Sequence, residues 1–270
     1  MINNFTLIEK IGEGGFSEVY KAKDNTGKYV AKNDFLAIKI LNLYSNSNVI
    51  DNEKNICMKL NDIDNNNIIK FYDYLEYDNK LYIYMEYING IELFDYITDT
   101  NNVLTDNEIK QIIIQMINAL NFLHGEDISH GDIKLENFMI TSDNQIILID
   151  FGLCNFTNKE LYEKKGTAMY AAPELVCIDD KGYDGKKIDM WALGTVIYIL
   201  KYKSYPFFGR SLSIIPEKFK SESDKSHYLS DNVHHPLKYK NNPFVSIIDG
   251  LICKDINKRL DITKLNSIIQ

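Results

Sequence analysis

The sequence predicts an α+β fold in two parts: a small part built on an antiparallel sheet with one main helix, and a larger, mostly helical part. Short β-type segments alternate with turn signals up to about residue 86, and apolar residues recur at helix spacing from about residue 90 onward. The 270 residues are 45% hydrophobic, which is enough to fill the core of one large domain or of two lobes with a cleft.

The first part is expected to contain five strands and one helix. The helix is expected over residues 49–60, and the Asn-rich residues 62–67 indicate a loop. The strands are expected at residues 5–10, 18–23, 35–41, 68–75 and 81–86.

The second part is expected to be built around two long helices. Thr105 and, three residues later, Glu108 have the sequence pattern of a capping box, and apolar residues follow at helix spacing as far as Leu123. Residues 188–200 are apolar nearly all round, which indicates a buried central helix. The mixed composition of residues 211–239 indicates surface helix and loop.

Composition narrows the choice of partner and compartment. The chain carries 30 basic and 38 acidic residues, and this net charge of -8 disfavours nucleic acid or an anionic membrane and suits a basic peptide. The four cysteines lack zinc-type or CxxC spacing, so we expect reduced thiols and a location in the cytoplasm or nucleus. We expect no signal peptide and no transmembrane segment, because the longest apolar stretch, residues 190–200, is too short to span a bilayer.

Two segments point to a chemistry. Residues 130–137 read HGDIKLEN, and a DFG segment begins at Asp150 behind an apolar run. In one tight loop, Asp132 can meet a nucleophile, Lys134 a phosphate and Asn137 a metal ion, and Asp150 can complete the metal site. This is the pattern of phosphoryl transfer, in which the protein mainly positions groups and neutralises charge.

A glycine-rich turn, GEGGFSEV at residues 12–19, lies between two expected strands. Taken alone, such a cluster marks an ordinary hairpin turn about as often as a ligand site. A dinucleotide-binding fingerprint requires a helix directly after the glycines, and the strand pattern that follows here excludes it. The remaining interpretation is a flap whose backbone amides cover phosphates, with Ser17 in place of the third glycine.

Lys39 lies in the apolar run LAIKIL on an expected strand. A buried ammonium needs an anionic partner, and Glu53 on the following helix is the obvious carboxylate; the pair would hold Lys39 against the α and β phosphates of a nucleotide. A snorkelling strand lysine is the alternative. Lys32 is a second candidate for the role, but the apolar residues on both sides favour Lys39.

Taken in order, these motifs resemble a eukaryotic protein kinase domain of the serine/threonine type over nearly the whole chain, and within that family the calcium/calmodulin- and cyclic-nucleotide-dependent groups. The resemblance implies a bilobal fold, one kinase domain with residues 1–87 as its N-lobe and residues 88–270 as its C-lobe. It implies ATP and Mg²⁺ as cofactors, with Mn²⁺ as a substitute for Mg²⁺, and Asn137 and Asp150 as metal ligands. The catalytic residues that it implies are Lys39, Glu53, Asp132 and Lys134.

The resemblance also implies how ATP is held. Met85 would be the gatekeeper, the backbone of Glu86 and Ile88 would hydrogen-bond to adenine, and Glu92 would reach the ribose. Val19, Ala37 and Met139 would sandwich the base. The residues expected to contact the nucleotide are Ile11, Gly12, Gly14, Phe16, Ser17, Val19, Ala37, Lys39, Met85, Glu86, Ile88, Glu92, Glu136, Met139 and Asp150.

Further segments resemble the part of a kinase that holds a peptide. GTAMYAAPE at residues 166–174 resembles the end of the activation segment, and DMWALG at residues 189–194 resembles the start of the central C-lobe helix. Arg259 is placed to form an ion pair with Glu174 that braces this segment. The alternative for Arg259 is a solvated charge on a terminal helix.

The expected acceptor is a Ser or Thr hydroxyl of a protein, because Lys134 together with Thr167 resembles the serine/threonine pattern. Glu136 matches a residue that recognises Arg before the phosphosite in similar kinases, and Glu92 can assist it. A second acidic position that those kinases use is Ile199 here. A preference for basic residues upstream of the acceptor is therefore a hypothesis.

Gly131 is the main departure from the family pattern, since an Arg usually stands before the catalytic Asp and grips a phosphate on the activation loop. The chain has only two Arg, both after residue 209, and Lys164 and Lys165 offer no bidentate clamp. We therefore expect activity to depend little on activation-loop phosphorylation at sites such as Thr157 or Tyr162.

Two other functions stay open. His130-Gly131-Asp132 with Asn137 resembles aminoglycoside and choline-type small-molecule kinases, although the peptide-binding segments argue against that class. A pseudokinase scaffold would lack one of the catalytic groups, and all of them are present. We expect a monomer that acts on a protein substrate and has neither nucleic acid nor a membrane as a partner.

Overall fold

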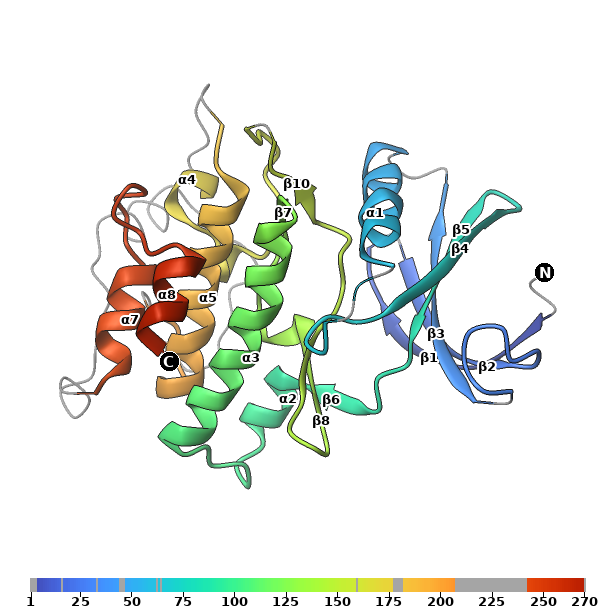
Figure 1. Ribbon diagram of the computed structural model, residues 1–270, viewed down its shortest axis with the longest axis horizontal. Coiled ribbons are helices and arrows are strands. Elements are labelled where there is room, and N and C mark those ends of the chain that lie inside the picture. The colour runs from blue at the N-terminus through green and yellow to red at the C-terminus, as the bar shows by residue number, and fades with distance from the viewer. Residues whose placement is uncertain are drawn as a thin grey trace. The chain divides into compact units, whose positions relative to one another are not determined.

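Figure 1 shows the computed structural model, which describes residues 4–15, 17–32, 34–43, 47–61, 63, 65–158, 160–176, 182–206 and 242–269. The expected surface segment 211–239 and the predicted nucleotide contact Phe16 lie outside the described residues. The chain forms two compact units. The first is Met1–Gly90 together with Ile149–Gly152, and the second is Ile91–Leu148 together with Leu153–Gln270.

The first unit is a five-stranded antiparallel sheet with one helix, α1 (Ser47–Leu60). The strand order is β1-β2-β3-β5-β4. The strands are β1 (Phe5–Glu13), β2 (Ser17–Asp24), β3 (Phe35–Asn42), β4 (Phe71–Tyr77) and β5 (Lys80–Glu86). All five predicted strands and the helix are confirmed. The fourth strand starts at Phe71 instead of residue 68, because Ile68 forms only a single β-bridge and the regular pairing begins at Phe71.

One face of this sheet is covered by the connection between β2 and β3. Asp24 at the end of β2 is buried, and its carboxylate accepts hydrogen bonds from the backbone N–H groups of Thr26, Gly27 and Tyr29. Burial alone would raise the pKa of Asp24, but these bonds and one from the Thr26 hydroxyl outweigh it and hold the pKa well below its usual value. The Tyr29 ring packs against Tyr84 of the sheet, with centroids 5.4 Å apart.

The second unit is mostly helical, as predicted (Figure 1). A small sheet has the order β6-β8-β9, and a second pairs β10 with β7. The helices and 3₁₀ turns are α2 (Leu93–Thr98), α3 (Asp106–Gly125), η2 (Leu135–Asn137), η3 (Ala168–Tyr170), α4 (Pro173–Val176), α5 (Gly185–Tyr202), α7 (Phe244–Leu251) and α8 (Ile262–Ile269). The strands are β6 (Gly90–Glu92), β7 (Ile128–Ser129), β8 (Phe138–Thr141), β9 (Ile146–Leu148) and β10 (Asn155–Phe156).

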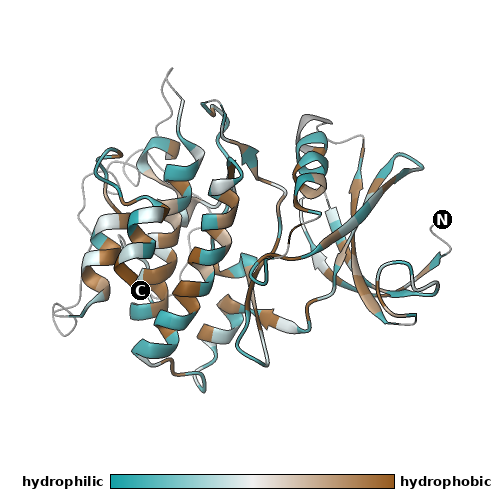
Figure 2. Cartoon of the chain, viewed as in Figure 1, coloured by the Kyte–Doolittle hydropathy of each residue, from teal (hydrophilic) through white to brown (hydrophobic). Residues whose placement is uncertain are grey.

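The two long helices form as the sequence patterns predict. At the start of α3, the N–H of Glu108 donates to the Thr105 hydroxyl at 3.3 Å and the N–H of Thr105 donates to the Glu108 carboxylate at 2.7 Å, which completes the capping box. Helix α5 is buried on all sides from Ile188 to Leu200. Figure 2 shows the hydrophobic residues along α3 and α5 in brown. The buried residues of α3 and α5 form much of the hydrophobic core of the second unit.

Two expectations about the whole chain concern cysteines and membranes. Cys57, Cys154 and Cys253 form no disulfide among the described residues, and Cys177 lies outside them. Among the residues that the structure describes, no helix is both long and apolar enough to cross a membrane.

Candidate active site

Lys39 lies in β3 with 8% of its surface exposed, and its ammonium contacts two carboxylates of the first unit. The Nζ atom is 2.5 Å from Glu53 Oε1 and 2.8 Å from Asp150 Oδ1. Burial alone would lower the pKa of Lys39, but the negative charges of Glu53 and Asp150 outweigh it and raise the pKa above its usual value. The predicted pair with Glu53 is present, whereas Lys32 is exposed. Lys39 is therefore not a snorkelling lysine, which was the alternative interpretation.

The neighbours of Asp150 explain its position. Phe151 is buried against Phe71 of β4, with ring centroids 5.4 Å apart, and this anchors the segment to the first unit. Asp150 has φ 59°, in the left-handed region. A Cβ atom on Gly152 would lie 3.4 Å from both Asp150 Oδ1 and Lys39 Nζ, so glycine allows the backbone to approach the charged cluster closely.

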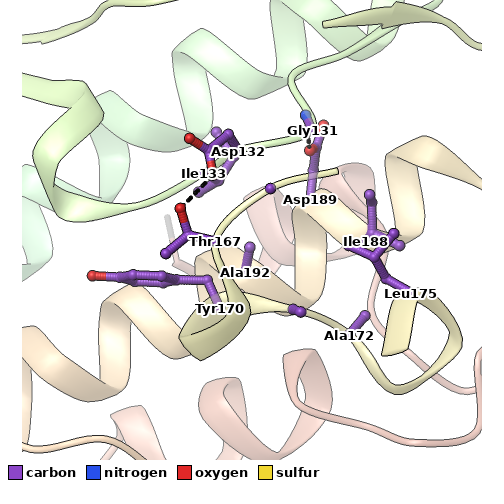
Figure 3. A pocket seen from close by; sticks show the side chains of 12 residues that line it. Gly131, Asp132, Ile133, Thr167, Tyr170, Ala172, Leu175, Ile188, Asp189 and Ala192 are labelled. Carbon is purple, nitrogen blue, oxygen red and sulfur yellow. Dashed lines mark hydrogen bonds between the residues drawn. The ribbon is translucent and has the colours of Figure 1, made fainter. Parts of the chain in front are cut away.

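The loop predicted to hold the catalytic residues belongs to the second unit, and Figure 3 shows Asp132 and Thr167 pointing toward each other. The Thr167 hydroxyl donates to Asp132 Oδ1 at 2.8 Å. Lys134 Nζ is 2.7 Å from Asp132 Oδ2 and donates to Thr167 Oγ1 at 3.1 Å. The Asn137 amide donates to the Asp132 carbonyl at 2.8 Å. The structure therefore brings Asp132, Lys134 and Asn137 together as the sequence predicted.

A buried carboxylate on α5 fixes the backbone of this loop. Asp189 accepts hydrogen bonds from the N–H groups of His130 and Gly131, both at 2.8 Å, and its Oδ2 is 3.0 Å from His124 Nε2 on α3. Sequence reasoning used Asp189 only to mark the start of the central helix and missed this role. The signal was present, because an Asp at the start of an apolar stretch of helix is buried with that stretch and must find hydrogen-bond donors.

Gly131 adopts φ 78°, where residues with a side chain are strained. A Cβ atom there would lie 2.6 Å from the carbonyl oxygen of Leu153, just past the DFG segment. Gly166, with φ 90°, would place a Cβ atom 2.8 Å from the Gly131 carbonyl oxygen. The backbones of the catalytic loop and of both ends of the activation segment therefore touch directly, and Gly131 is needed for that contact.

A small cavity of about 20 Å³ lies beside these groups and is lined by Asp132, Thr167, Tyr170, Ile188 and Asp189, among others (Figure 3). This volume has room for about one water molecule. The cavity lies between the catalytic loop, the activation segment and α5.

Arg259 forms the predicted ion pair with Glu174. Arg259 is 1% exposed, and its guanidinium binds Glu174 through two nitrogens, at 2.5 and 3.0 Å. Further N–H groups of the guanidinium donate to the carbonyls of Cys253 and Lys187, both at 2.9 Å. The group also lies 5.1 Å from the ring centroid of Trp191. A solvated charge does not describe this residue.

Acidic side chains gather where the sequence expects a peptide to bind. Burial raises the pKa of Glu92, and the nearby charges of Asp95 and Glu136 raise it further. Glu136 also accepts a hydrogen bond from Tyr170 at 3.3 Å. Burial, followed by the charge of Glu136, raises the pKa of Tyr170 well above its usual value, so this hydroxyl stays a donor. Glu92, Asp95 and Glu136 thus form an acidic group that concentrates negative charge.

The remaining predicted nucleotide contacts fall into two sets. In the first unit, Gly12 lies opposite Val19 in the hairpin of β1 and β2, and the N–H of Gly14 donates to the Ser17 carbonyl at 2.8 Å. The hairpin excludes the dinucleotide fingerprint, as predicted. Val19, Ala37, Lys39 and Met85 share one face of the sheet by register, with Ile11 in β1, Glu86 at the end of β5 and Ile88 just after it. Glu92, Glu136 and Met139 belong to the second unit.

The two predicted metal ligands are both oxygen donors. The Asn137 amide nitrogen donates to Asp132, which directs the amide oxygen to the other side, and the carboxylate of Asp150 is 51% exposed. An amide oxygen and a carboxylate are ligands that Mg²⁺ accepts in proteins. Asn137 and Asp150 lie in different units, and their joint role stays a prediction.

Residues 5–268 match the family model of the protein kinase domain. The chain belongs to this family. The kinase domain is 30% identical over 235 residues to maternal embryonic leucine zipper kinase of Danio rerio, a match that covers 85% of this chain and 34% of the relative. It is 33% identical over 214 residues to CBL-interacting protein kinase 9 of Oryza sativa, covering 76% and 45% of the two chains. It is 35% identical over 220 residues to serine/threonine-protein kinase SIK1 of Mus musculus, covering 79% and 27%.

This kinase domain spans less than half of the length of each of these three relatives. Family membership confirms the predicted fold class and implies the use of ATP, a divalent metal and a protein substrate. Of these three relatives, SIK1 is named as a serine/threonine-protein kinase. The resemblance to the calcium/calmodulin- and cyclic-nucleotide-dependent groups stays a prediction.

Proposed function

We propose that this chain transfers the γ-phosphoryl group of ATP to a Ser or Thr hydroxyl of a protein substrate. The observation that carries the proposal is the contact between Asp132, Lys134 and Thr167, in which one carboxylate binds both an ammonium and the hydroxyl of the activation segment. This contact joins the phosphoryl-transfer loop to the segment that resembles a peptide-binding ledge. A small-molecule kinase would have no use for such a link.

In this mechanism the protein supplies positioned charges. Asp132 orients the acceptor hydroxyl and takes up its proton on a carboxylate oxygen, while Lys134, bound to the same carboxylate, offsets the charge on the transferred phosphoryl group. Lys39 is held by Glu53 and Asp150 and offsets charge on the other phosphates. Asn137 and Asp150 would hold Mg²⁺, which supplies further neutralisation of the phosphate oxygens.

The test is transfer of labelled phosphate from ATP with Mg²⁺ to a generic basic protein. We expect transfer by the native chain and its loss in Asp150→Ala, whereas Asp143→Ala, in the exposed turn between β8 and β9, should retain it. Binding of ATP without any transfer would indicate a pseudokinase scaffold. Transfer to aminoglycosides or choline, and not to protein, would indicate a small-molecule kinase.

We also propose that activity depends little on phosphorylation of the activation segment. Gly131 and Gly166 dock that segment on the catalytic loop by direct backbone contact, and Thr167 is hydrogen-bonded to Asp132 without any phosphate. Of the two candidate phosphosites, Tyr162 is 58% exposed, whereas the Thr157 hydroxyl is buried. Phosphatase-treated protein and Tyr162→Phe should therefore keep the native kcat. Loss of activity after phosphatase treatment would contradict this.

A preference for Arg or Lys upstream of the acceptor is supported by the charge of Glu92, Asp95 and Glu136. Ile199 is buried and apolar, so this position adds no negative charge. A degenerate peptide library should show enrichment of basic residues before the phosphosite, and Glu92→Gln should reduce it. A library without such enrichment would contradict the preference. The cytoplasmic or nuclear location and the monomeric state stay predictions.

A further inference from the structure

Lys21 of β2 lies between two aromatic rings of the first unit. Its ammonium is 4.4 Å from the ring centroid of Phe35 and 4.3 Å from that of Tyr87, and the two ring centroids are 6.3 Å apart. The Lys21 side chain is only 19% exposed, although lysine is usually a surface residue. Distances below about 6 Å place the cation in attractive contact with both rings.

These three residues continue the face of the sheet on which the nucleotide is expected. Lys21 lies opposite Ala37 in the pairing of β2 with β3, and Ala37 lies opposite Met85 in the pairing of β3 with β5. Because side chains alternate between the two faces of a sheet, Phe35 shares the face of Ala37, two residues earlier on β3. Tyr87 stands two residues after Met85. The cluster therefore borders the expected adenine site.

Tyr87 also lies between the two residues whose backbone is expected to bind adenine. Strand β5 ends at Glu86, whose N–H donates to the Lys70 carbonyl at 2.9 Å, and residues 87–89 have no regular secondary structure. Past that point, the Tyr87 ring attaches the chain to the sheet through Lys21 and Phe35. Glu9 Oε1 on β1 lies 4.0 Å from the Lys21 ammonium.

We propose that Lys21 is a positioning residue for adenine binding. Its ammonium holds Phe35 and Tyr87 together and so fixes the backbone of Glu86 and Ile88 in the geometry that meets the base. This inference rests on the proposed ATP-dependent function. It assigns Lys21 no contact with the phosphates and no part in the transfer step.

The test separates an effect on adenine binding from an effect on phosphate binding. Lys21→Met keeps the apolar stem and removes the charge, and the full chain should then bind adenosine roughly 3- to 10-fold more weakly, as expected for a lost cation–π contact. Binding of tripolyphosphate with Mg²⁺ should be unchanged. In kinetics, KM for ATP should rise by the same factor while kcat stays within about twofold.

Two variants control the result. Lys21→Arg retains a cation that stacks on aromatic rings and should restore adenosine binding, and Lys32→Met removes an exposed lysine of the same unit and should bind as the native chain does. If Lys21→Met fails to fold, Tyr87→Leu gives the same comparison with Lys21 in place.

The outcomes are distinct. Equal weakening of adenosine and tripolyphosphate in Lys21→Met would show a general loss of structure and overturn the proposal. Native adenosine binding in that variant would overturn it as well, while leaving the kinase function intact. A native chain that binds neither ligand would overturn both this inference and the proposed function.

Discussion

Gly131 offers a prediction that the geometry makes quantitative. In Gly131→Ala, a residue with a side chain must hold φ 78°, which costs about 1–2 kcal/mol. Its Cβ atom would also lie 2.6 Å from the Leu153 carbonyl oxygen, and relieving an overpacked contact costs about 1–3 kcal/mol more. We therefore expect the free energy of unfolding to fall by about 2–5 kcal/mol. The same reasoning predicts that Gly131→Arg destabilises the protein and does not create a phosphate-operated switch.

Urea unfolding of the native and variant chains measures this loss, with the m-value checked for constancy. Gly125→Ala is the matched control, because a Cβ atom at this last residue of α3 would meet nothing within 4 Å. The control should stay within about 1 kcal/mol of the native chain or gain stability, since alanine favours helix more than glycine does. If Gly131→Ala loses no more stability than Gly125→Ala, the account of the backbone contact is wrong.

Three other substitutions test separate parts of the structure. Arg259→Met should lower the free energy of unfolding by about 3–5 kcal/mol because it leaves Glu174 without its buried partner, and a loss below about 1 kcal/mol in urea unfolding would refute the bracing role. Asp24→Asn should cost about 2–3 kcal/mol at pH 7. Because folding lowers the pKa of Asp24, its stabilising effect is present above the ordinary Asp pKa of about 4 and is lost as the pH falls below that value. The free energies of unfolding of the native chain and of Asp24→Asn should therefore converge at low pH. A difference between them that does not change with pH would refute this. Lys39→Met should lower kcat/KM for phosphoryl transfer at least about 100-fold while Lys32→Met retains it, and equal losses in steady-state kinetics would refute the choice of Lys39.

The parts of the fold that the sequence predicted depend on local patterns. The capping box of Thr105 and Glu108 lies within one turn, and the strands follow from the alternation of apolar residues over a few positions. The partnership of Lys39 with Glu53 was also predictable, because a lysine inside an apolar strand must find a carboxylate and the next helix offers one. Such inferences need no knowledge of how distant segments meet.

The contacts that sequence reasoning missed join segments far apart in the chain. Asp189 binds the N–H groups of His130 and Gly131 across a separation of 59 and 58 residues, and no local pattern reports such a pairing. Likewise, Gly131 was interpreted as a lost Arg, whereas its φ and its distance to Leu153 show a backbone contact that only glycine allows. The start of β4 was placed three residues early, because a buried residue such as Ile68 is apolar whether or not it belongs to a regular strand.

The most direct measurement of the central claim is transfer of labelled phosphate from ATP with Mg²⁺ to two basic peptides that differ only in having Ser or Ala at the acceptor position. We expect phosphate on the Ser peptide alone, and loss of that signal in Asp132→Asn, which keeps the shape of the side chain but cannot accept the proton as a carboxylate does. Labelling of neither peptide by a chain that binds ATP, or equal labelling by Asp132→Asn, would contradict the claim that this chain is a protein serine/threonine kinase acting through Asp132.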